Sequence, residues 1–355
     1  MLNERLFLVG VITQKEDKQE KIDLLNELVD LGKTSGGEVV EKIIQRREKI
    51  DPRYFIGKGK AEELAKIAEE LNINIFIFDT ELSGIQKRNL EEITNRKVLD
   101  RTELILDIFS KHASTMGAKI EVEITQLKYS RSRLTGKGIE MSRLGGGIGT
   151  MGPGEKKLET DRRKIKDRLH TLNKKLEMIE KSRIVQSNQR RSLRRVALVG
   201  YTNAGKSTIM NKLTRSDLLV ENKLFSTLDS TTRTLMGPNL EKVLVTDTVG
   251  FLRKLPHELI NSFKSTLQEA IESDLRLHVV DISHPNCEEH LAAGNALLEE
   301  LGVIKRPMIY VFNKIDKDAF LVETFKLKYP DALFISAHQD IQPLKDAIFS
   351  FFSLT

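Results

Sequence analysis

The chain has 355 residues, of which 39% are hydrophobic and 30% charged, a composition typical of a globular protein with two or three domains. No apolar stretch approaches the roughly 20 residues that span a bilayer, and the charged start of the chain does not fit a secretory signal. The single cysteine, Cys287, cannot form an internal disulfide, and no cluster of His and Cys suggests a zinc site. We therefore expect a reducing, cytoplasmic setting and no membrane-spanning segment.

The first hundred residues alternate short apolar runs with amphipathic stretches. Residues 5–12, 38–47 and 73–79 have the character of strands. Residues 19–37 and 59–72 have helical spacing, and the first of these stretches stops at two glycines. Strands that alternate with helices imply a parallel sheet covered on both faces, so we assign residues 1–100 to a small α/β domain.

The pattern changes from about residue 101, and no strand-like run occurs before residue 193. Residues 118–134 are helical with one apolar stripe, and a glycine-rich loop follows. Apolar residues then recur between Leu158 and Ile179 at spacings of 7, 4, 3, 4 and 3, which is coiled-coil spacing. Two helices with matching stripes should pair as an antiparallel hairpin. We therefore predict a helical arm over residues 101–192, with the glycine-rich loop 145–154 at its tip.

Basic residues are concentrated in the second half of this arm. Between residues 155 and 195 there are 15 Lys or Arg against 6 Asp or Glu, a local balance of +9 in a chain whose net charge is +6. The rest of the chain is therefore slightly acidic. A basic segment on such a protein indicates a contact with a polyanion, and a solvated helix face is the alternative; charge alone does not decide between them.

Strands and helices alternate again from residue 193 to the end of the chain. The predicted strands are residues 193–200, 242–248, 275–281, 307–314 and 332–336, and the last helix covers 343–352. We assign residues 193–355 to a second doubly wound α/β domain, of a usual domain size.

A phosphate-binding motif directly follows the first of these strands. Residues 200–207 read GYTNAGKS and match the pattern G-x-x-x-x-G-K-S. The glycines let backbone N–H groups wrap phosphates, and the helix that follows points its N-terminus at them. We expect Lys206 to reach the β- and γ-phosphates of a nucleotide, and the Ser207 hydroxyl to bind Mg²⁺.

Three further motifs end later strands, at the sheet edge where ligands bind in such folds. Asp247, in DTVG, can hold a water bound to Mg²⁺, and the N–H of Gly250 can bind the γ-phosphate. Asp316, in NKID, has the two oxygens needed to accept from the paired donors of guanine, which adenine lacks. The N–H of Ala337, in ISA, can meet the guanine O6. The four motifs occur in the order expected of a Mg²⁺-dependent GTPase.

One threonine of a GTPase closes over Mg²⁺ when the γ-phosphate is present. Residues 224–233 offer Thr227, Thr231 and Thr232, and spacing alone does not choose among them. We select Thr227, because similar GTPases place this threonine in an aromatic-x-Thr-Leu setting.

The side chain that orients the attacking water is missing. Phe251 follows Gly250 where many GTPases carry a glutamine, so we expect slow hydrolysis until a partner or a cation completes the site. In related GTPases an asparagine at the position of Asn203 helps to bind K⁺ beside the phosphates. Partial activation by K⁺ is therefore our hypothesis, and a plain turn residue is the alternative.

The predicted site can be summarised by role. The residues expected to act in catalysis are Lys206, Thr227 and Gly250, and those expected to bind the metal are Ser207 and Thr227. The residues expected to contact GTP or GDP are Gly200, Tyr201, Thr202, Asn203, Ala204, Gly205, Lys206, Ser207, Thr208, Phe225, Ser226, Thr227, Leu228, Asp229, Asp247, Thr248, Val249, Gly250, Asn313, Lys314, Ile315, Asp316, Ser336, Ala337 and His338.

Six segments carry a resemblance to a known family. They are GYTNAGKST, LFSTLDSTTR, DTVGFLRKLPHELINSFKSTLQEA and NKID, preceded by DPRYFIGKGKAEEL and SRLGGGIGTMGPGEKKLETDRR. With them the chain resembles, over nearly its whole length, the HflX family of translational GTPases. A hydrophobic residue after the DTVG glycine belongs to the family pattern, so Phe251 does not indicate an inactive enzyme.

The resemblance implies a GTPase that binds the ribosome, mainly its large 50S subunit, and that the ribosome stimulates. In some members it implies separation or rescue of stalled ribosomes during stress. Ribosomal RNA would then be the polyanion for the basic arm, and the glycine-rich tip could enter a narrow RNA channel. Two alternatives stay open: a GTPase of tRNA modification or ribosome assembly, and an ATP-dependent RNA remodeller in the N-terminal domain with a regulatory GTPase domain. Nothing in the sequence demands more than a monomer.

Overall fold

The computed structural model describes residues 4–14, 16–134, 153–188, 193–214, 224–225, 230–237, 241–254, 267–317 and 319–354. The chain forms two compact units, one of residues 1–111 and 119–177, the other of residues 112–118 and 178–355. The boundary between the two units falls inside the long helix α7 (Pro153–Asn188). The division into three domains stays a prediction.

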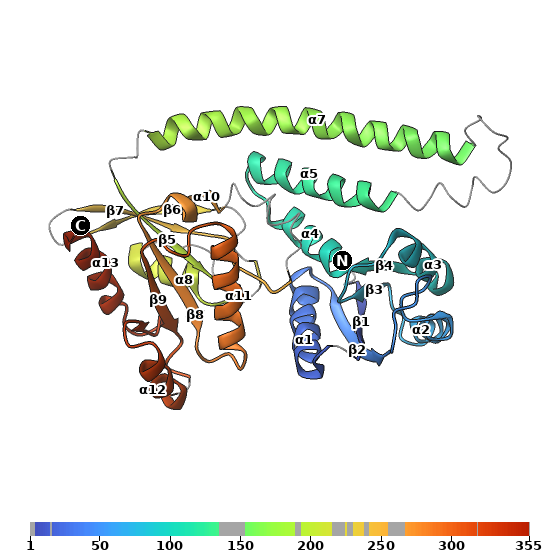
Figure 1. The fold of residues 1–355 in the computed structure, drawn as a ribbon, viewed down its shortest axis with the longest axis horizontal. Coiled ribbons are helices and arrows are strands. Elements are labelled where there is room, and N and C mark those ends of the chain that lie inside the picture. Colours follow the sequence, from blue (N-terminus) through green and yellow to red (C-terminus); the bar gives the residue numbers. More distant parts are fainter. Residues whose placement is uncertain are drawn as a thin grey trace. The chain divides into compact units, whose positions relative to one another are not determined.

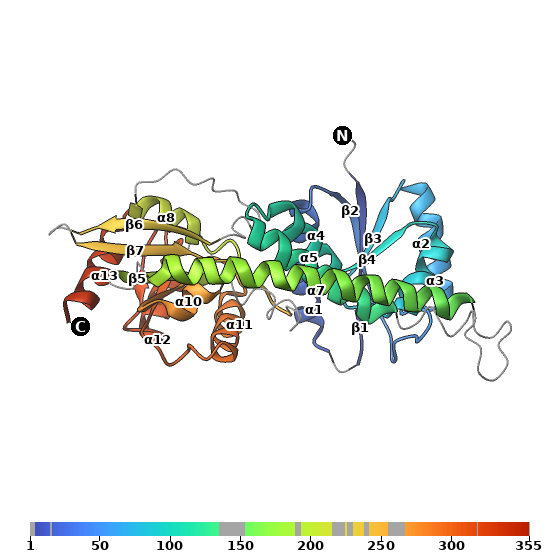
Figure 2. The same cartoon turned by 90° about the horizontal axis from the view of Figure 1, so that it is seen from above.

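The first unit contains a parallel sheet, as predicted, and this sheet has four strands. In spatial order its strands are β2 (Glu38–Arg46), β1 (Arg5–Ile12), β3 (Ile75–Phe78) and β4 (Lys97–Asp100). Figures 1 and 2 show α1 (Lys18–Thr34) on one face of this sheet and α2 (Lys58–Glu70) and α3 (Gly84–Thr94) on the other. The sequence analysis missed β4, which has only four residues.

Both faces of this sheet are apolar, which explains why its central strands read as continuous hydrophobic runs. Phe7 of β1 and Phe76 of β3 lie in one core cluster with residues of α2 and α3, and their ring centroids are 5.5 Å apart. On the opposite face, Gly32 of α1 packs so closely on Leu6 that a Cβ there would lie 3.2 Å from its side chain. The helix starts are fixed locally: the side chain of Asp17 accepts from the N–H of Glu20 at 2.9 Å.

The predicted antiparallel helical hairpin is confirmed. It is formed by α5 (Met116–Arg133), which follows α4 (Arg101–His112), and by α7, and the two lie side by side in Figures 1 and 2. Arg168 of α7 pairs with Glu123 of α5 at 2.7 Å. The predicted apolar stripes are buried along both helices, at Ile120, Ile124, Leu169 and Leu172. Of the predicted glycine-rich tip, residues 145–152 lie outside the described residues.

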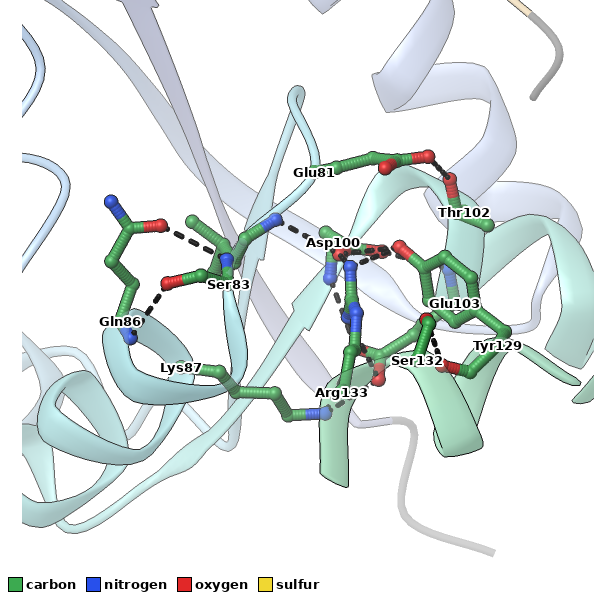
Figure 3. A network of polar contacts seen from close by, with 11 residues as sticks. Glu81, Ser83, Gln86, Lys87, Asp100, Thr102, Glu103, Tyr129, Ser132 and Arg133 are labelled. Carbon is green, nitrogen blue, oxygen red and sulfur yellow. Dashed lines mark hydrogen bonds and ion pairs between the residues drawn. The ribbon is translucent and has the colours of Figure 1, made fainter. Parts of the chain in front are cut away.

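A buried carboxylate anchors the C-terminal end of α5 to the sheet of the first unit. Asp100, fully buried at the end of β4, accepts from the Tyr129 hydroxyl at 2.9 Å and from the Arg133 guanidinium (Figure 3). Arg133 also lies 3.4 Å from Glu103, which pairs with Lys87 at 2.7 Å. Burial and the nearby Asp100 raise the pKa of Tyr129, so its hydroxyl remains a donor. This set of side chains joins the arm to the sheet of the first unit and is called the arm-base network below.

The second unit contains a mostly parallel sheet, as predicted, but with six strands where five were predicted. In spatial order its strands are β10 (Leu333–Phe334), β9 (Met308–Asn313), β8 (Leu275–Asp281), β5 (Arg194–Gly200), β7 (Lys242–Asp247) and β6 (Thr231–Met236). All pairs are parallel except the one between β6 and β7. The described helices of this part of the chain are α8 (Lys206–Thr214), α10 (Gln268–Glu272), α11 (Cys287–Glu300), α12 (Ala319–Lys328) and α13 (Gln342–Leu354).

Candidate nucleotide-binding site

The loop that joins β5 to α8 has the curvature of a phosphate-binding loop. Gly200 has a φ of +142° and Gly205 a φ of +96°; a Cβ there would lie 2.1 Å from the Val279 carbonyl oxygen or 2.3 Å from the Asn313 side-chain nitrogen. Both positions therefore require glycine. Asn203, between them, has a left-handed φ of +61°, which asparagine adopts more readily than most residues.

Lys206 begins α8 and is buried under this loop. Its Nζ donates to the carbonyl oxygens of Gly200 at 3.0 Å and Tyr201 at 2.8 Å. Burial lowers the pKa of Lys206 to about 8, and the carboxylate of Asp247 opposes part of this shift. Two of the three ammonium donors thus hold the loop, which positions the lysine before any ligand binds.

The serine of the loop and the carboxylate of the DTVG motif meet at one point. The Ser207 hydroxyl donates to Asp247 Oδ2 at 2.5 Å. Asp247 is brought there because β7 pairs with β5 in parallel, with Asp247 opposite Leu198. The next residue, Thr248, secures the strand end by donating its hydroxyl to the Leu198 carbonyl at 2.7 Å.

The glycine of DTVG lies against the phosphate-binding loop. The N–H of Thr202 donates to the Phe251 carbonyl at 2.8 Å, and the N–H of Phe251 donates to the Gly200 carbonyl at 3.0 Å. A Cβ at Gly250 would lie 2.7 Å from Thr202 Cα and 3.0 Å from Lys206 Nζ, so this approach also requires glycine. The ring of Phe251 is 2% exposed and packs in the core of the unit, so it presents no group to a water molecule in the site.

The asparagine of NKID ties two loops together. Asn313 Nδ2 donates to the Ala204 carbonyl at 2.9 Å, and Asn313 Oδ1 accepts from the Ala337 N–H at 3.0 Å. The same side chain therefore fixes the phosphate-binding loop and the ISA motif at the ends of β9 and β10. The predicted contact of the Ala337 N–H with a guanine O6 stays a prediction, and here that N–H is already engaged by Asn313.

The lysine of NKID makes a second tie. Lys314 Nζ donates to the Asn203 carbonyl at 2.9 Å and to Asp281 Oδ2 at 2.6 Å. The sequence analysis missed Asp281. A signal was available in the sequence. The motif residues Asp247 and Asn313 are the last residues of β7 and β9, and Asp281 has the same place at the end of β8.

Asp316 is exposed at the same edge of the sheet. The nearby hydroxyl of Ser336 lowers its pKa, so the carboxylate is ionised at neutral pH. Ser336 and Ala337 are buried, whereas His338 is exposed. The side chains proposed to recognise the base thus lie on two neighbouring strand ends, with a solvent-facing carboxylate at the outside.

The threonine loop is only partly described. Ser226, Thr227, Leu228 and Asp229 lie outside the described residues, so their roles stay predictions. Phe225 is described and is buried with a left-handed φ of +56°. The two threonines that were not selected lie on β6, where the Thr232 hydroxyl is 2.9 Å from the Thr246 hydroxyl. The other predicted contacts beside the motifs, Thr208, Val249 and Ile315, range from buried to half-buried.

This arrangement defines a class of protein: a P-loop nucleotide-binding domain with the motif order of GTPases. Three family models match along the chain: "GTP-binding GTPase N-terminal" over residues 23–110, "GTP-binding GTPase Middle Region" over 112–190, and "50S ribosome-binding GTPase" over 195–314. The GTPase HflX of Lacrimispora saccharolytica is 51% identical over 318 residues, which cover 89% of this chain and 74% of the relative. That of Escherichia coli K12 is 40% identical over 316 residues, covering 88% and 73%. The chain belongs to the HflX GTPase family, as its resemblance indicated.

Solved structures show the same organisation. The chain is 25% identical to a protein whose structure is described as "SsGBP and GDP complex", with a TM-score of 0.55 and 98% of both chains covered. A GTP-binding protein of Sulfolobus solfataricus in complex with GDP is 23% identical, with a TM-score of 0.50, and supports the fold alone. Among the helices that the structure describes, none is both long and apolar enough to cross a membrane.

Proposed function

We propose that this chain binds GTP with Mg²⁺ at the carboxyl ends of β5, β7, β9 and β10, and hydrolyses it in contact with the large ribosomal subunit. One observation carries the GTP part of the proposal. Segments far apart in sequence meet there through direct bonds: Ser207 with Asp247, and Asn313 with both Ala204 and Ala337. A site preorganised in this way is what nucleotide binding requires.

The residues present fit a magnesium ion. The Ser207 hydroxyl and the Asp247 carboxylate meet at 2.5 Å beside the phosphate-binding loop, and Mg²⁺ prefers oxygen ligands of this kind together with phosphate. Ser207 would bind the ion, Asp247 would hold one of its waters, and Thr227 is proposed as the ligand that joins when GTP is bound. The ion, when bound, neutralises charge on the β- and γ-phosphates.

Guanine selection is assigned to the other end of the site. Asp316 is ionised and exposed next to Ser336, so it can accept from the two donors of a guanine edge. Lys206, already positioned by the loop, would contact the β- and γ-phosphates. The N–H of Gly250 would hold the γ-phosphate, and the close packing of Gly250 on Thr202 keeps this glycine beside the phosphate-binding loop.

Hydrolysis by the isolated chain should be slow because Phe251 is buried and cannot orient water. We infer that the ribosome supplies the missing help. K⁺ near Asn203 is a second proposed contribution: the backbone of Asn203 is held by Lys314, and its side chain is exposed. Equal rates in KCl and NaCl would exclude the K⁺ contribution.

The large-subunit contact is assigned to the helical arm. Several basic side chains of α7 are exposed, among them Arg163, Lys164, Lys174 and Lys175, whereas Leu169 and Leu172 are buried. A helix with exposed basic side chains on one face and apolar residues on the other can bind along an RNA backbone. We propose that the arm and its glycine-rich tip act in separating or rescuing stalled ribosomes under stress, and that the protein acts as a monomer.

GTP hydrolysis with and without purified 50S subunits, in K⁺ buffer, tests this function. We expect a large stimulation that Lys206→Ala abolishes, since the variant loses the ammonium at the phosphates. Lys212→Ala is the matched control: it removes an exposed lysine from the same helix and should behave like the wild type.

Stimulation that survives Lys206→Ala would contradict the assigned site. Guanine nucleotide binding without stimulation would point to ribosome precursors or tRNA as partners. ATP hydrolysis that persists in Lys206→Ala would favour a remodelling N-terminal domain.

A further inference from the structure

Asp281 ends β8 beside the proposed guanine-binding strand. Its Oδ1 accepts from the N–H of Ser283 at 3.1 Å and from the Ser283 hydroxyl at 2.6 Å, which fixes the plane of the carboxylate. Its Oδ2 is thereby turned to Lys314, whose Nζ lies 2.6 Å away. The N–H of Ile282 donates to the Asn313 carbonyl at 3.1 Å, so the two strand ends are also joined through the backbone.

The backbone and the side chain of Lys314 are both held in a restricted conformation. The residue has a left-handed φ of +65°, which is uncommon for a residue with a long side chain. Its Nζ reaches the Asn203 carbonyl at 2.9 Å, so the methylene chain spans the distance from the end of β9 to the phosphate-binding loop. The base and the phosphates of one nucleotide belong at the two ends of that span.

We propose that Asp281 is a positioning residue for guanine nucleotide binding. Its carboxylate holds Lys314 Nζ on the Asn203 carbonyl, so that the Lys314 side chain forms a fixed wall between the base end and the phosphate end of the site. The inference rests on the function proposed above. It assigns a role to a residue outside the motifs for phosphate, magnesium and guanine.

Two physical effects of Asp281 predict opposite changes in nucleotide affinity, so a measurement can distinguish them. As an anchor, Asp281 favours nucleotide binding by restricting Lys314, whose side chain is 17% exposed and would otherwise sample other rotamers. As a negative charge near the phosphate-binding loop, it would disfavour phosphate binding. The ion pair with Lys314 cancels most of that charge, and charge-assisted hydrogen bonds are the stronger kind. We therefore expect the anchor to dominate.

The test is the dissociation rate of a fluorescent GDP analogue, measured by stopped flow. Loss of one charge-assisted hydrogen bond predicts that Asp281→Ala releases the analogue roughly 10-fold faster. Asp281→Asn keeps an acceptor and the turn to Ser283, so it should fold normally and give a smaller increase of about 3-fold. Ser283→Ala is the matched control: it removes the hydroxyl donor to Oδ1 but keeps the Ser283 N–H on the same oxygen and the contact of Oδ2 with Lys314, so its rate should stay much closer to the wild type than that of Asp281→Ala.

A double-mutant cycle isolates the interaction. In Lys314→Ala, the further change Asp281→Ala should add little, because Asp281 acts through Lys314. The same cycle applied to thermal unfolding without nucleotide should also show coupling, which needs no ligand. In steady-state hydrolysis, Asp281→Ala should raise KM with kcat changed less than about 2-fold, since no group at the reacting atoms is touched.

An unchanged or slower release from Asp281→Ala would overturn the proposal, as would additive effects in the cycle. Failure of the proposed function looks different. If the wild type and Ser283→Ala do not bind the GDP analogue, or if Lys206→Ala binds it as well as the wild type, then the assigned nucleotide site is wrong irrespective of Asp281.

Discussion

The two units each contain a buried polar centre, and the centres are built in opposite ways. In the second unit, Lys206 and Asn313 bond mainly to backbone carbonyl and N–H groups of neighbouring loops. In the arm-base network of the first unit, Asp100, Tyr129 and Arg133 bond to one another through side chains (Figure 3). The first arrangement shapes loops for a ligand. The second satisfies its own charges and fixes how a helix packs.

The two centres differ in which polar groups they present to a ligand. The loop of the second unit presents backbone N–H groups and a lysine at the start of a helix, a geometry suited to anions. The arm-base network pairs a carboxylate with a guanidinium, so a buried charge is compensated internally. These contacts join the end of α5 to the sheet. The first unit should therefore be sensitive to loss of either charge, and the second to loss of loop contacts.

The largest effect should come from removing the carboxylate of the arm-base network. Asp100→Ala leaves Arg133 buried without its main partner, which costs about 3–5 kcal/mol of unfolding free energy. Amide hydrogen exchange of peptides from the two units measures this, and protection should fall in the first unit only. Asp107→Ala is the control: its exposed carboxylate pairs with Lys111 at 2.9 Å, and its loss should cost under about 1 kcal/mol. Equal effects of both variants would contradict a central role for Asp100.

Acid should affect the stability of the two units differently as well. Burial lowers the pKa of His278, on β8, from 6.5 to about 4. As pH falls from 6.5 to 4, His278 therefore becomes protonated in the unfolded chain but stays neutral in the folded chain, and stability decreases across this window. Below about pH 4 both states are protonated and the loss levels off. In the first unit, the pKa of Tyr129 is raised instead, away from the acid range.

At about 1.4 kcal/mol per pKa unit, the second unit should lose about 3 kcal/mol between pH 6.5 and 4 through His278. Unfolding of the wild type and of His278→Gln across this range measures the contribution. The variant should start less stable but show a flatter pH dependence. His170→Gln, which replaces an exposed histidine of α7, should keep the wild-type slope. An unchanged slope in His278→Gln would show that other groups govern the acid response.

The contrast also explains what the sequence could reveal. The nucleotide-site residues occur in short motifs at strand ends, because backbone geometry forces glycine at Gly200, Gly205 and Gly250 and leaves a readable pattern. The partners of Asp100 are separated from it by 29 residues at Tyr129 and 33 at Arg133, and such isolated positions form no pattern.

The missed elements have similar reasons. β4 is four residues long, and its inner residues Val98 and Leu99 are too few for a periodic signal. β6 (Thr231–Met236) is rich in threonine and was not predicted as a strand, although the side chain of Thr232 meets Thr246 of the neighbouring strand. Asp281 was missed because it lies outside the four motifs, although its place at the end of β8 was an available signal.

A moderate effect should follow from removing the tie between loops in the second unit. Asn313→Ala leaves the Ala204 carbonyl and the Ala337 N–H without their buried partner, at a cost of about 2 kcal/mol of unfolding free energy. Because the phosphate-binding loop loses its preorganisation, GDP should also bind roughly 10-fold more weakly. Calorimetric titration and unit-resolved hydrogen exchange measure both quantities.

The control for this prediction is Asn295→Ala, which removes a long contact of 3.4 Å with the Tyr310 hydroxyl and a contact with His278 in the same unit. It should leave GDP affinity unchanged. If Asn313→Ala lowers stability without weakening GDP binding, the loop is shaped by its glycines alone, and the comparison between a ligand-shaping centre and a packing centre loses its basis.

The smallest effect should be that of Tyr129→Phe. The variant keeps the ring, over which the Arg133 guanidinium lies at 3.9 Å, and removes the hydroxyl, which donates to Asp100 and accepts from Arg133. The Arg133 guanidinium and the Leu82 N–H continue to donate to that carboxylate, so the cost should be about 1 kcal/mol, far less than in Asp100→Ala. The double variant tests whether the network acts as one unit: Tyr129→Phe should add little once Asp100 is alanine. Additive losses would mean that Tyr129 and Arg133 anchor α5 independently, and the arm-base network would then be a set of separate contacts.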